Sequence, residues 1–223
     1  MRKLAALVLL GYLVLLGVAM GWQDKLIFFP TRGGRVTGPG RDLQLKAADG
    51  VELHARYIEQ PGARHTLLFL HGNAGNLAGR SYQLQQLAAA GAHVLALDYR
   101  GYGVSQGQPS EAGVYSDALA AYAWATAHTP AARQFPWLPV RYLVRTRFDN
   151  LQKIAKVRAP KLFIHSRGDE LIPFEMATRL FEAAPDPKRA LWLDHPGHNE
   201  TFALEAERVV LSIRAFLNSL PAS

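Results

Sequence analysis

Cysteine is absent from this chain of 223 residues. Disulfide bonds, thiolate nucleophiles and thiolate-bound metal sites are therefore excluded. Internal repeats and low-complexity tracts are also lacking, and the length leaves room for one globular domain with a short appendage. The sequence thus predicts a single domain without covalent cross-links.

Charged side chains are missing from one long stretch near the N-terminus, residues 4–22. As a helix this stretch would reach roughly 28 Å, close to the thickness of a bilayer's hydrocarbon layer. Because Arg2 and Lys3 precede it, we expect a single-pass membrane protein whose globular part lies on the extracytoplasmic side. A cleaved secretory signal is the alternative, since residues 17–19 are small and could form the cleavage site.

Motifs for nucleic-acid binding are lacking as well, although the net charge is +7. A basic surface of this kind either faces anionic lipid or is simply solvated. The sequence therefore predicts a membrane lipid as a partner and no nucleic acid.

Strand-like and helix-like patterns alternate along most of the chain. We divide it into an N-terminal anchor or signal (1–25), a connector rich in Gly, Pro and Arg (26–42) and one domain (43–223). Residues 43–58 are typical of a β-hairpin turned at Asp49 and Gly50. The alternation that follows favours a mainly parallel sheet with helices on both faces. The strands are predicted at residues 65–72, 93–98, 161–166 and 189–194, and the helices at 81–91 with Ser81 as N-cap, 111–128, 175–184 and 202–220.

A turn of small and polar residues, 71–76, follows the first of these buried strands. Its backbone N–H groups could form an oxyanion hole, which stabilises the negative oxygen of a tetrahedral intermediate. The alternative is an ordinary tight turn between a strand and a helix.

An acid and a histidine follow the last two predicted strands. Asp169 lies in the loop after one strand, and His198 lies just before the final helix. A carboxylate that orients an imidazole is the supporting half of a serine-hydrolase triad, and parallel-sheet hydrolases place the acid before the histidine. His195 and His198 also have an HxxH spacing, but zinc needs a third ligand, so we predict no metal site.

Residues 103–107 match the pattern GxSxG, which raises Ser105 as a nucleophile. A nucleophile elbow requires a buried strand that runs directly into the serine and a helix that starts directly after it. Here the strand ends at Asp98, and Pro109 delays the helix to about Glu111. We therefore interpret Ser105 as part of a glycine-rich turn. No other serine fits better, so the nucleophile stays unknown.

Five stretches together resemble the α/β-hydrolase superfamily, in particular its small, singly membrane-anchored serine-hydrolase branch. The resemblance implies that Asn73 and Ala74 supply oxyanion-hole N–H groups, that Asp169 is the triad acid and that His198 is the triad base. It also implies hydrolysis of esters or thioesters, often of acyl lipids, on a small acyl ester substrate and without a cofactor. The stretches are FLHGNAGN (69–76), LDYRGYGVSQGQPSE (97–111), FPWLPVRYLVRTRFDNLQKI (135–154), HSRGDELIPF (165–174) and PGHNET (196–201).

The segment that should hold the nucleophile is very short in this chain. Only ten residues lie between Trp124 and Phe135, where the family has a strand, an elbow, a helix and a further strand. A strand-helix-strand unit needs roughly 30 residues or more. We therefore expect a sheet shortened by this central segment, closed by pairing of residues 161–165 with 67–71. With no serine in place, the alternative to an ester hydrolase is a non-catalytic protein that binds an acyl ligand or a partner at the membrane.

Overall fold

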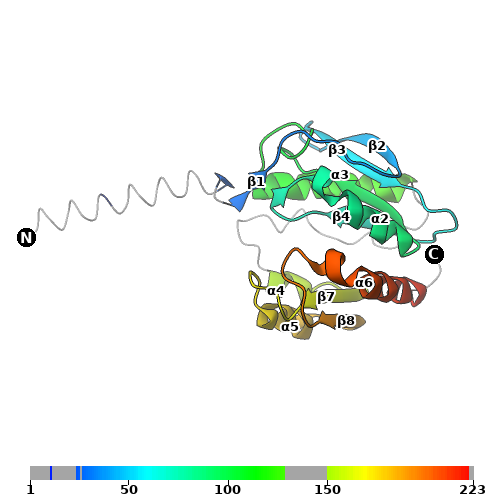
Figure 1. Cartoon of the computed structure of the whole chain (residues 1–223). Coiled ribbons are helices and arrows are strands. Elements are labelled where there is room, and N and C mark those ends of the chain that lie inside the picture. The colour runs from blue at the N-terminus through cyan, green and yellow to red at the C-terminus, as the bar shows by residue number, and fades with distance from the viewer. Residues whose placement is uncertain (1–10, 12–23, 26, 129–149, 221–223) are drawn as a thin grey trace, which may run out of the picture.

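The computed structural model describes residues 11, 24–25, 27–128 and 150–220 of the chain. Strands and helices alternate in it as the sequence predicts (Figure 1). The strands are β1 (Phe29–Pro30), β2 (Arg41–Lys46), β3 (Glu52–Ile58), β4 (Thr66–Leu70), β5 (Ala74–Gly75), β6 (His93–Leu97), β7 (Lys161–Ser166) and β8 (Lys188–Leu193). The helices are η1 (Leu77–Arg80), α2 (Ser81–Ala89), α3 (Glu111–His128), α4 (Asn150–Ile154), α5 (Phe174–Ala183) and α6 (Thr201–Asn218).

The larger sheet has the strand order β2-β3-β6-β4. β2 and β3 form the predicted antiparallel hairpin, and Gly50 in its turn has a φ of 88°, a left-handed conformation that glycine adopts without a steric penalty. β3 pairs with β6 in antiparallel and β4 pairs with β6 in parallel orientation. The hairpin thus covers one side of β6, and β4 covers the other.

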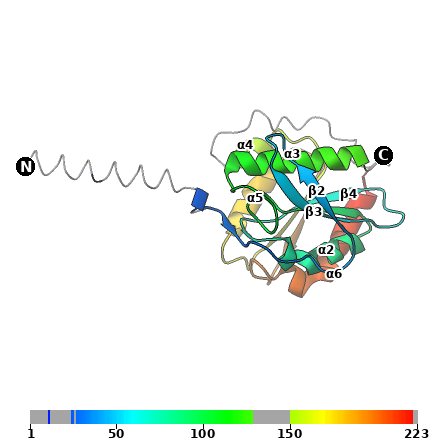
Figure 2. The ribbon, with the colours of Figure 1, turned by 90° about the horizontal axis from the view of Figure 1, so that it is seen from above.

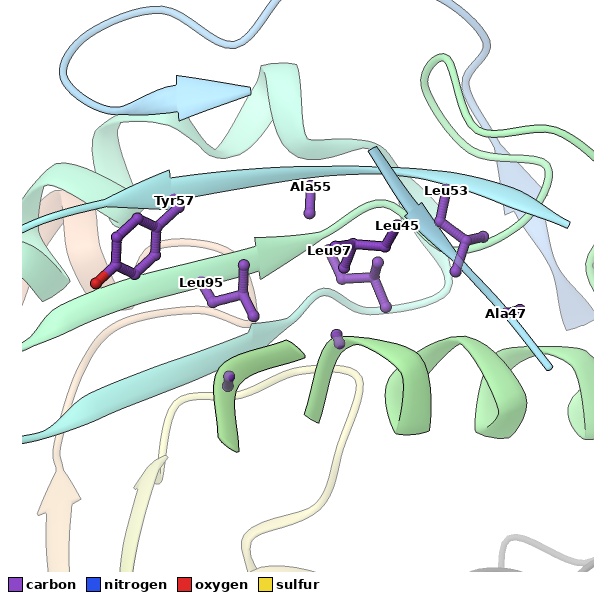
Figure 3. Close-up of a cluster of buried hydrophobic side chains, with 9 residues drawn as sticks. Leu45, Ala47, Leu53, Ala55, Tyr57, Leu95 and Leu97 are labelled. Carbon is purple, nitrogen blue, oxygen red and sulfur yellow. The ribbon is translucent and has the colours of Figure 1, made fainter. Parts of the chain in front are cut away.

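Hydrophobic core lies on both faces of this sheet, because the side chains of β6 alternate between them. Leu95 and Leu97 belong to a cluster that lies between the sheet and α3, as Figure 3 shows. Val94 and Ala96 belong to a second cluster with residues of α2. Figure 2 shows α3 on one side of the sheet and α2 with α6 on the other. A strand buried on both faces in this way explains the continuous apolar run in the sequence.

β7 and β8 form a separate, parallel two-stranded sheet. Within the described ranges β4 pairs only with β6 and β7 only with β8, so the expected pairing of residues 161–165 with 67–71 is wrong. The reason is that β7 and β8 have a core of their own: the ring of Phe181 on α5 packs edge-on against Phe163 and Trp192. α6 contacts α2 on one sheet and both β7 and β8 on the other. In the part of the chain that the structure describes, a shared helix rather than shared backbone hydrogen bonds therefore joins the two sheets.

The predicted membrane anchor needs correction. No helix in the part of the chain that the structure describes is long and apolar enough to cross a membrane. This finding contradicts both the transmembrane helix and the single-pass localisation. The longest described helices, α3 and α6, have 18 residues each and cover sheets, with polar groups such as Asp117 and Arg208 in their sequences. Residues 4–22 themselves, apart from Gly11, lie outside the described ranges.

Candidate active site

Asp169 and His198 come together at one end of the smaller sheet. Because β7 and β8 are parallel neighbours, the loops that follow them meet at the same edge of the sheet. Nδ1 of His198 lies 2.9 Å from Oδ2 and 3.1 Å from Oδ1 of Asp169. The structure therefore pairs the two side chains that the sequence singles out.

The carboxylate of Asp169 is held by its own loop. The backbone N–H groups of Leu171 and Ile172 donate to Oδ1 over 3.0 and 2.8 Å. Burial by itself would raise the pKa of Asp169, but the amide of Ile172, the ring of His198 and the amide of Leu171 together lower it. The ionised carboxylate favours the tautomer of His198 with a proton on Nδ1, which leaves Nε2 as the basic nitrogen.

Glu170, which no sequence motif singles out, supports the backbone of the loop that holds His198. Its Oε2 accepts a hydrogen bond from the backbone N–H of His198 over 3.0 Å. The side chain of His198 is 35% exposed, and its Nε2 forms no hydrogen bond with any described residue. The basic nitrogen is thus open to water or to a substrate. Only the position of Glu170 directly after Asp169 could have suggested its role.

The turn 71–76 contains the two predicted oxyanion donors. The carbonyl oxygen of Asn73 accepts hydrogen bonds from the backbone N–H of Phe29 and from the hydroxyl of Tyr102, each over 2.8 Å. Burial raises the pKa of Tyr102 to about 12, so this hydroxyl stays protonated at neutral pH. In a planar trans peptide the N–H group points opposite to the carbonyl. The N–H of Ala74 is therefore directed away from both Phe29 and Tyr102.

Ser105 is buried, and its hydroxyl group forms hydrogen bonds with backbone groups. Its side-chain oxygen donates to the carbonyl of Asp98 over 2.7 Å and accepts from the backbone N–H of His54 over 2.8 Å. The residue is only 2% exposed. These bonds join the end of β6 to β3, as expected of a structural turn. No serine in the described ranges forms a hydrogen bond with His198.

Asp98, which directly follows β6, links the turn 71–76 to β3. Its Oδ1 accepts from the backbone N–H of Leu77 over 2.8 Å, and its Oδ2 lies 3.2 Å from Nδ1 of His54. Nε2 of His71 lies 3.5 Å from Oδ1 of Asp98. Burial by itself would raise the pKa of Asp98, but His54, His71 and the Leu77 amide lower it. No sequence motif assigned this role to Asp98, although an acid directly after a buried strand was a usable signal.

A cavity of about 390 Å³ lies beside the acid loop. Its wall includes Ile172, whose amide holds Asp169, and His165, whose Nε2 lies 3.9 Å from the Asp169 carboxylate. The rest of the wall comes mainly from apolar side chains of β7, β8 and α5, among them Phe163, Ile164, Met176, Leu180 and Trp192. The acid–histidine pair thus borders an apolar space that the sequence did not reveal.

Among the described residues, His195 and His198 do not belong to a group of side chains that could bind a metal ion. Within the described ranges no group of three or more His, Asp or Glu side chains is placed to hold a metal ion. The arrangement of Asp169 and His198 is instead that of an acid–base pair, able to take up and return one proton at Nε2.

A family model described as the alpha/beta hydrolase fold matches residues 65–137. An uncharacterized protein of Mycobacterium tuberculosis is 31% identical in an alignment that covers 87% of each of the two chains. The chain belongs to the α/β-hydrolase superfamily. Alpha/beta hydrolase domain-containing protein 17C of Xenopus laevis is 30% identical over 67% of this α/β-hydrolase and 61% of the frog protein.

Solved structures agree with this α/β-hydrolase assignment at the level of the fold. Esterase Pf2001 of Pyrococcus furiosus superposes with a TM-score of 0.68 and 16% identity, over 86% of this chain and 97% of that one. An esterase of Exiguobacterium antarcticum superposes with a TM-score of 0.58 and 16% identity, over 80% of this chain and 100% of that one. The predicted α/β-hydrolase-like fold is therefore confirmed.

Proposed function

We propose that this α/β-hydrolase hydrolyses esters or thioesters of acyl groups. Asp169 and His198 form the acid–base pair, and the backbone N–H groups of Asn73 and Ala74 are the oxyanion donors. The observation that carries the proposal is the 2.9 Å contact between His198 Nδ1 and Asp169 Oδ2, with Nε2 left open. The esterases among the similar structures support this reaction class. The apolar cavity beside Asp169 supports an apolar acyl group in the substrate.

In the mechanism that we propose, water takes the place of a serine. Nε2 of His198 removes a proton from a water molecule as its oxygen attacks the acyl carbon. The carbonyl oxygen becomes negative, and the N–H groups of the turn stabilise it. The bond to the leaving oxygen or sulfur then breaks, and Nε2 returns the proton to that atom. One water is consumed, and a carboxylic acid and an alcohol or thiol are released.

A shortened chain supports the choice of water over serine. The alignment with the mycobacterial relative is 244 positions long, more than the 223 residues of this chain, of which it uses 87%. That relative therefore has residues at positions where this chain has none. General-base activation of water by a positioned histidine accelerates a reaction by about 10²- to 10⁴-fold. We expect slow turnover of this order.

The test uses the full-length chain with p-nitrophenyl acetate and a fluorophosphonate probe. We expect hydrolysis about 10³-fold above background and no covalent labelling by the probe. His198→Ala should remove most of this rate, whereas His195→Ala, in the same loop, should not. Hydrolysis that is indifferent to His198→Ala would overturn the proposed function. Fluorophosphonate labelling that Ser105→Ala abolishes would instead replace water by a serine nucleophile.

A further inference from the structure

Residues 27–33, here called the strap, run alongside the turn 71–76. β1 within the strap pairs in parallel with β5 within the turn. The backbone N–H of Thr31 donates to the carbonyl of Gly75 over 3.0 Å, next to the bond from Phe29 to Asn73. Figure 1 shows β1 at the edge of the part of the molecule that holds β2, β3 and β4. The turn is thus paired like a strand with a segment that precedes the whole sheet.

Two asparagine side chains fasten the turn to the strap. Nδ2 of Asn73 donates to the carbonyl of Ile27 over 2.8 Å. Nδ2 of Asn76 donates to the carbonyls of Thr31 and Gly33 over 3.0 and 2.7 Å. Oδ1 of Asn76 accepts a hydrogen bond from the backbone N–H of Gly79 within η1. The two amide groups therefore bind the strap from the middle and from the C-terminal end of the turn.

The strap is equally well tied to the loop that follows β6. The guanidinium of Arg32 donates to the carbonyls of Ser105 and Gly107, each over 2.8 Å. The backbone of Gly103 accepts from Gly33 over 2.7 Å and donates to Thr31 over 2.9 Å. The strap therefore bridges the loops that follow β4 and β6.

An apolar contact anchors the strap as well. Phe28 is 8% exposed and packs in a cluster with Tyr102 and Val114. Tyr102 is the residue whose hydroxyl holds the carbonyl of Asn73. One buried side chain of the strap thus sits against the group that orients the turn.

We propose that the strap is a positioning element of the catalytic site. By holding the carbonyl of Asn73, it fixes the peptide that carries the N–H of Ala74, the donor that faces the developing oxyanion. Fixed donors stabilise that charge without reorganising during the reaction, so a peptide free to rotate loses this advantage. The catalytic part of this inference rests on the proposed function, whereas the fastening of the turn does not.

The test compares Asn76→Asp with the unaltered chain. Aspartate has the same shape and can still accept the bond from Gly79, but it cannot donate to the carbonyls of Thr31 and Gly33. We expect hydrogen exchange of the backbone amides in 27–33 and 71–76 to accelerate at least about tenfold. The kcat for p-nitrophenyl acetate should fall about 10- to 100-fold, while KM changes less than about twofold.

Two further variants sharpen this test. Arg32→Ala removes the bonds to the loop after β6 and should accelerate exchange in the strap even if Asn76→Asp fails to fold. Arg35→Ala is the matched control, because Arg35 is exposed and forms no hydrogen bond or ion pair with any described residue. It should leave exchange and kcat unchanged.

The outcomes separate the strap from the proposed function. Unchanged exchange in both Asn76→Asp and Arg32→Ala would overturn the inference. So would faster exchange with an unchanged kcat, because a purely structural segment behaves in that way. A wild-type chain without any hydrolysis overturns the proposed function, and accelerated exchange in the two variants then still supports the strap as the element that fixes the turn.

Discussion

At the scale of single residues, Ser105 shows that a GxSxG match can be a structural turn as well as a nucleophile elbow. Gly103 and Gly107 have φ values of 52° and 80°, so the GxSxG match here is a turn built on left-handed glycines. Its serine faces backbone groups of β3 and of the residue after β6. The hydroxyl satisfies buried polar groups that would otherwise have no partner.

Ser105→Ala tests this structural role. The substitution leaves the backbone N–H of His54 without its acceptor. We expect the free energy of unfolding to fall by about 1 to 3 kcal/mol, measured by urea denaturation, and hydrolysis of p-nitrophenyl acetate to stay unchanged. Ser212→Ala on α6 is the control for serine removal. Lost hydrolysis at unchanged stability would contradict this assignment.

At the scale of the elements, the sequence predicts the positions of the helices better than it predicts their N-caps. α3 has the bounds that its composition predicts, Glu111–His128. The prediction of Ser81 as an N-cap is wrong: α2 begins at Ser81 directly after η1, whose cap is Asn76. The helical backbone starts one turn earlier because Asn76 accepts a bond from Gly79. Caps depend on such local bonds, which periodicity does not encode.

α3 is attached to the loop after β6 through Asp117, which is fully buried. Asp117 accepts bonds from the backbone N–H of Arg100 over 2.8 Å and from its guanidinium over 2.8 to 3.1 Å. Burial raises the pKa of Asp117, while Arg100 opposes that shift. The buried carboxylate of Asp117 therefore fixes α3 to this loop.

Asp117→Ala should destabilise the chain by about 3 kcal/mol, because it removes the buried acceptor of the Arg100 backbone N–H and leaves the guanidinium with the half-exposed Asp49 as its one remaining acid among the described residues. Urea denaturation followed by circular dichroism measures the change. Glu207→Ala, an exposed acid on α6, should alter the unfolding free energy by less than about 0.5 kcal/mol. Equal effects of the two substitutions would show that the contact with Arg100 contributes nothing specific.

At the scale of the whole molecule, the two sheets are the main departure from expectation. β6 has a partner on each side, whereas β4 has one partner within the described ranges. Backbone groups that lack a ladder partner open to solvent more easily. The exposed fraction agrees with this, since Leu70 at the end of β4 is 41% exposed and Leu97 of β6 is 0% exposed.

Hydrogen exchange can therefore rank the two strands. We expect the amides of β4 to exchange at least about tenfold faster on average than those of β6, with the edge strand β2 as an internal reference. Mass spectrometry of peptic fragments would measure the difference. Equal protection of β4 and β6 would mean that another strand pairs along β4.

The sequence by itself determined the order of strands and helices, the hairpin, and the acid–histidine pair. Those features follow from local patterns: apolar runs that end in polar residues, and parallel neighbours that bring their loops together. The tertiary structure alone decided that Ser105 faces backbone, that β4 and β7 do not pair within the described ranges, and that the strap pairs with the turn 71–76. These depend on contacts between segments far apart in the chain, whose free energies no local pattern specifies.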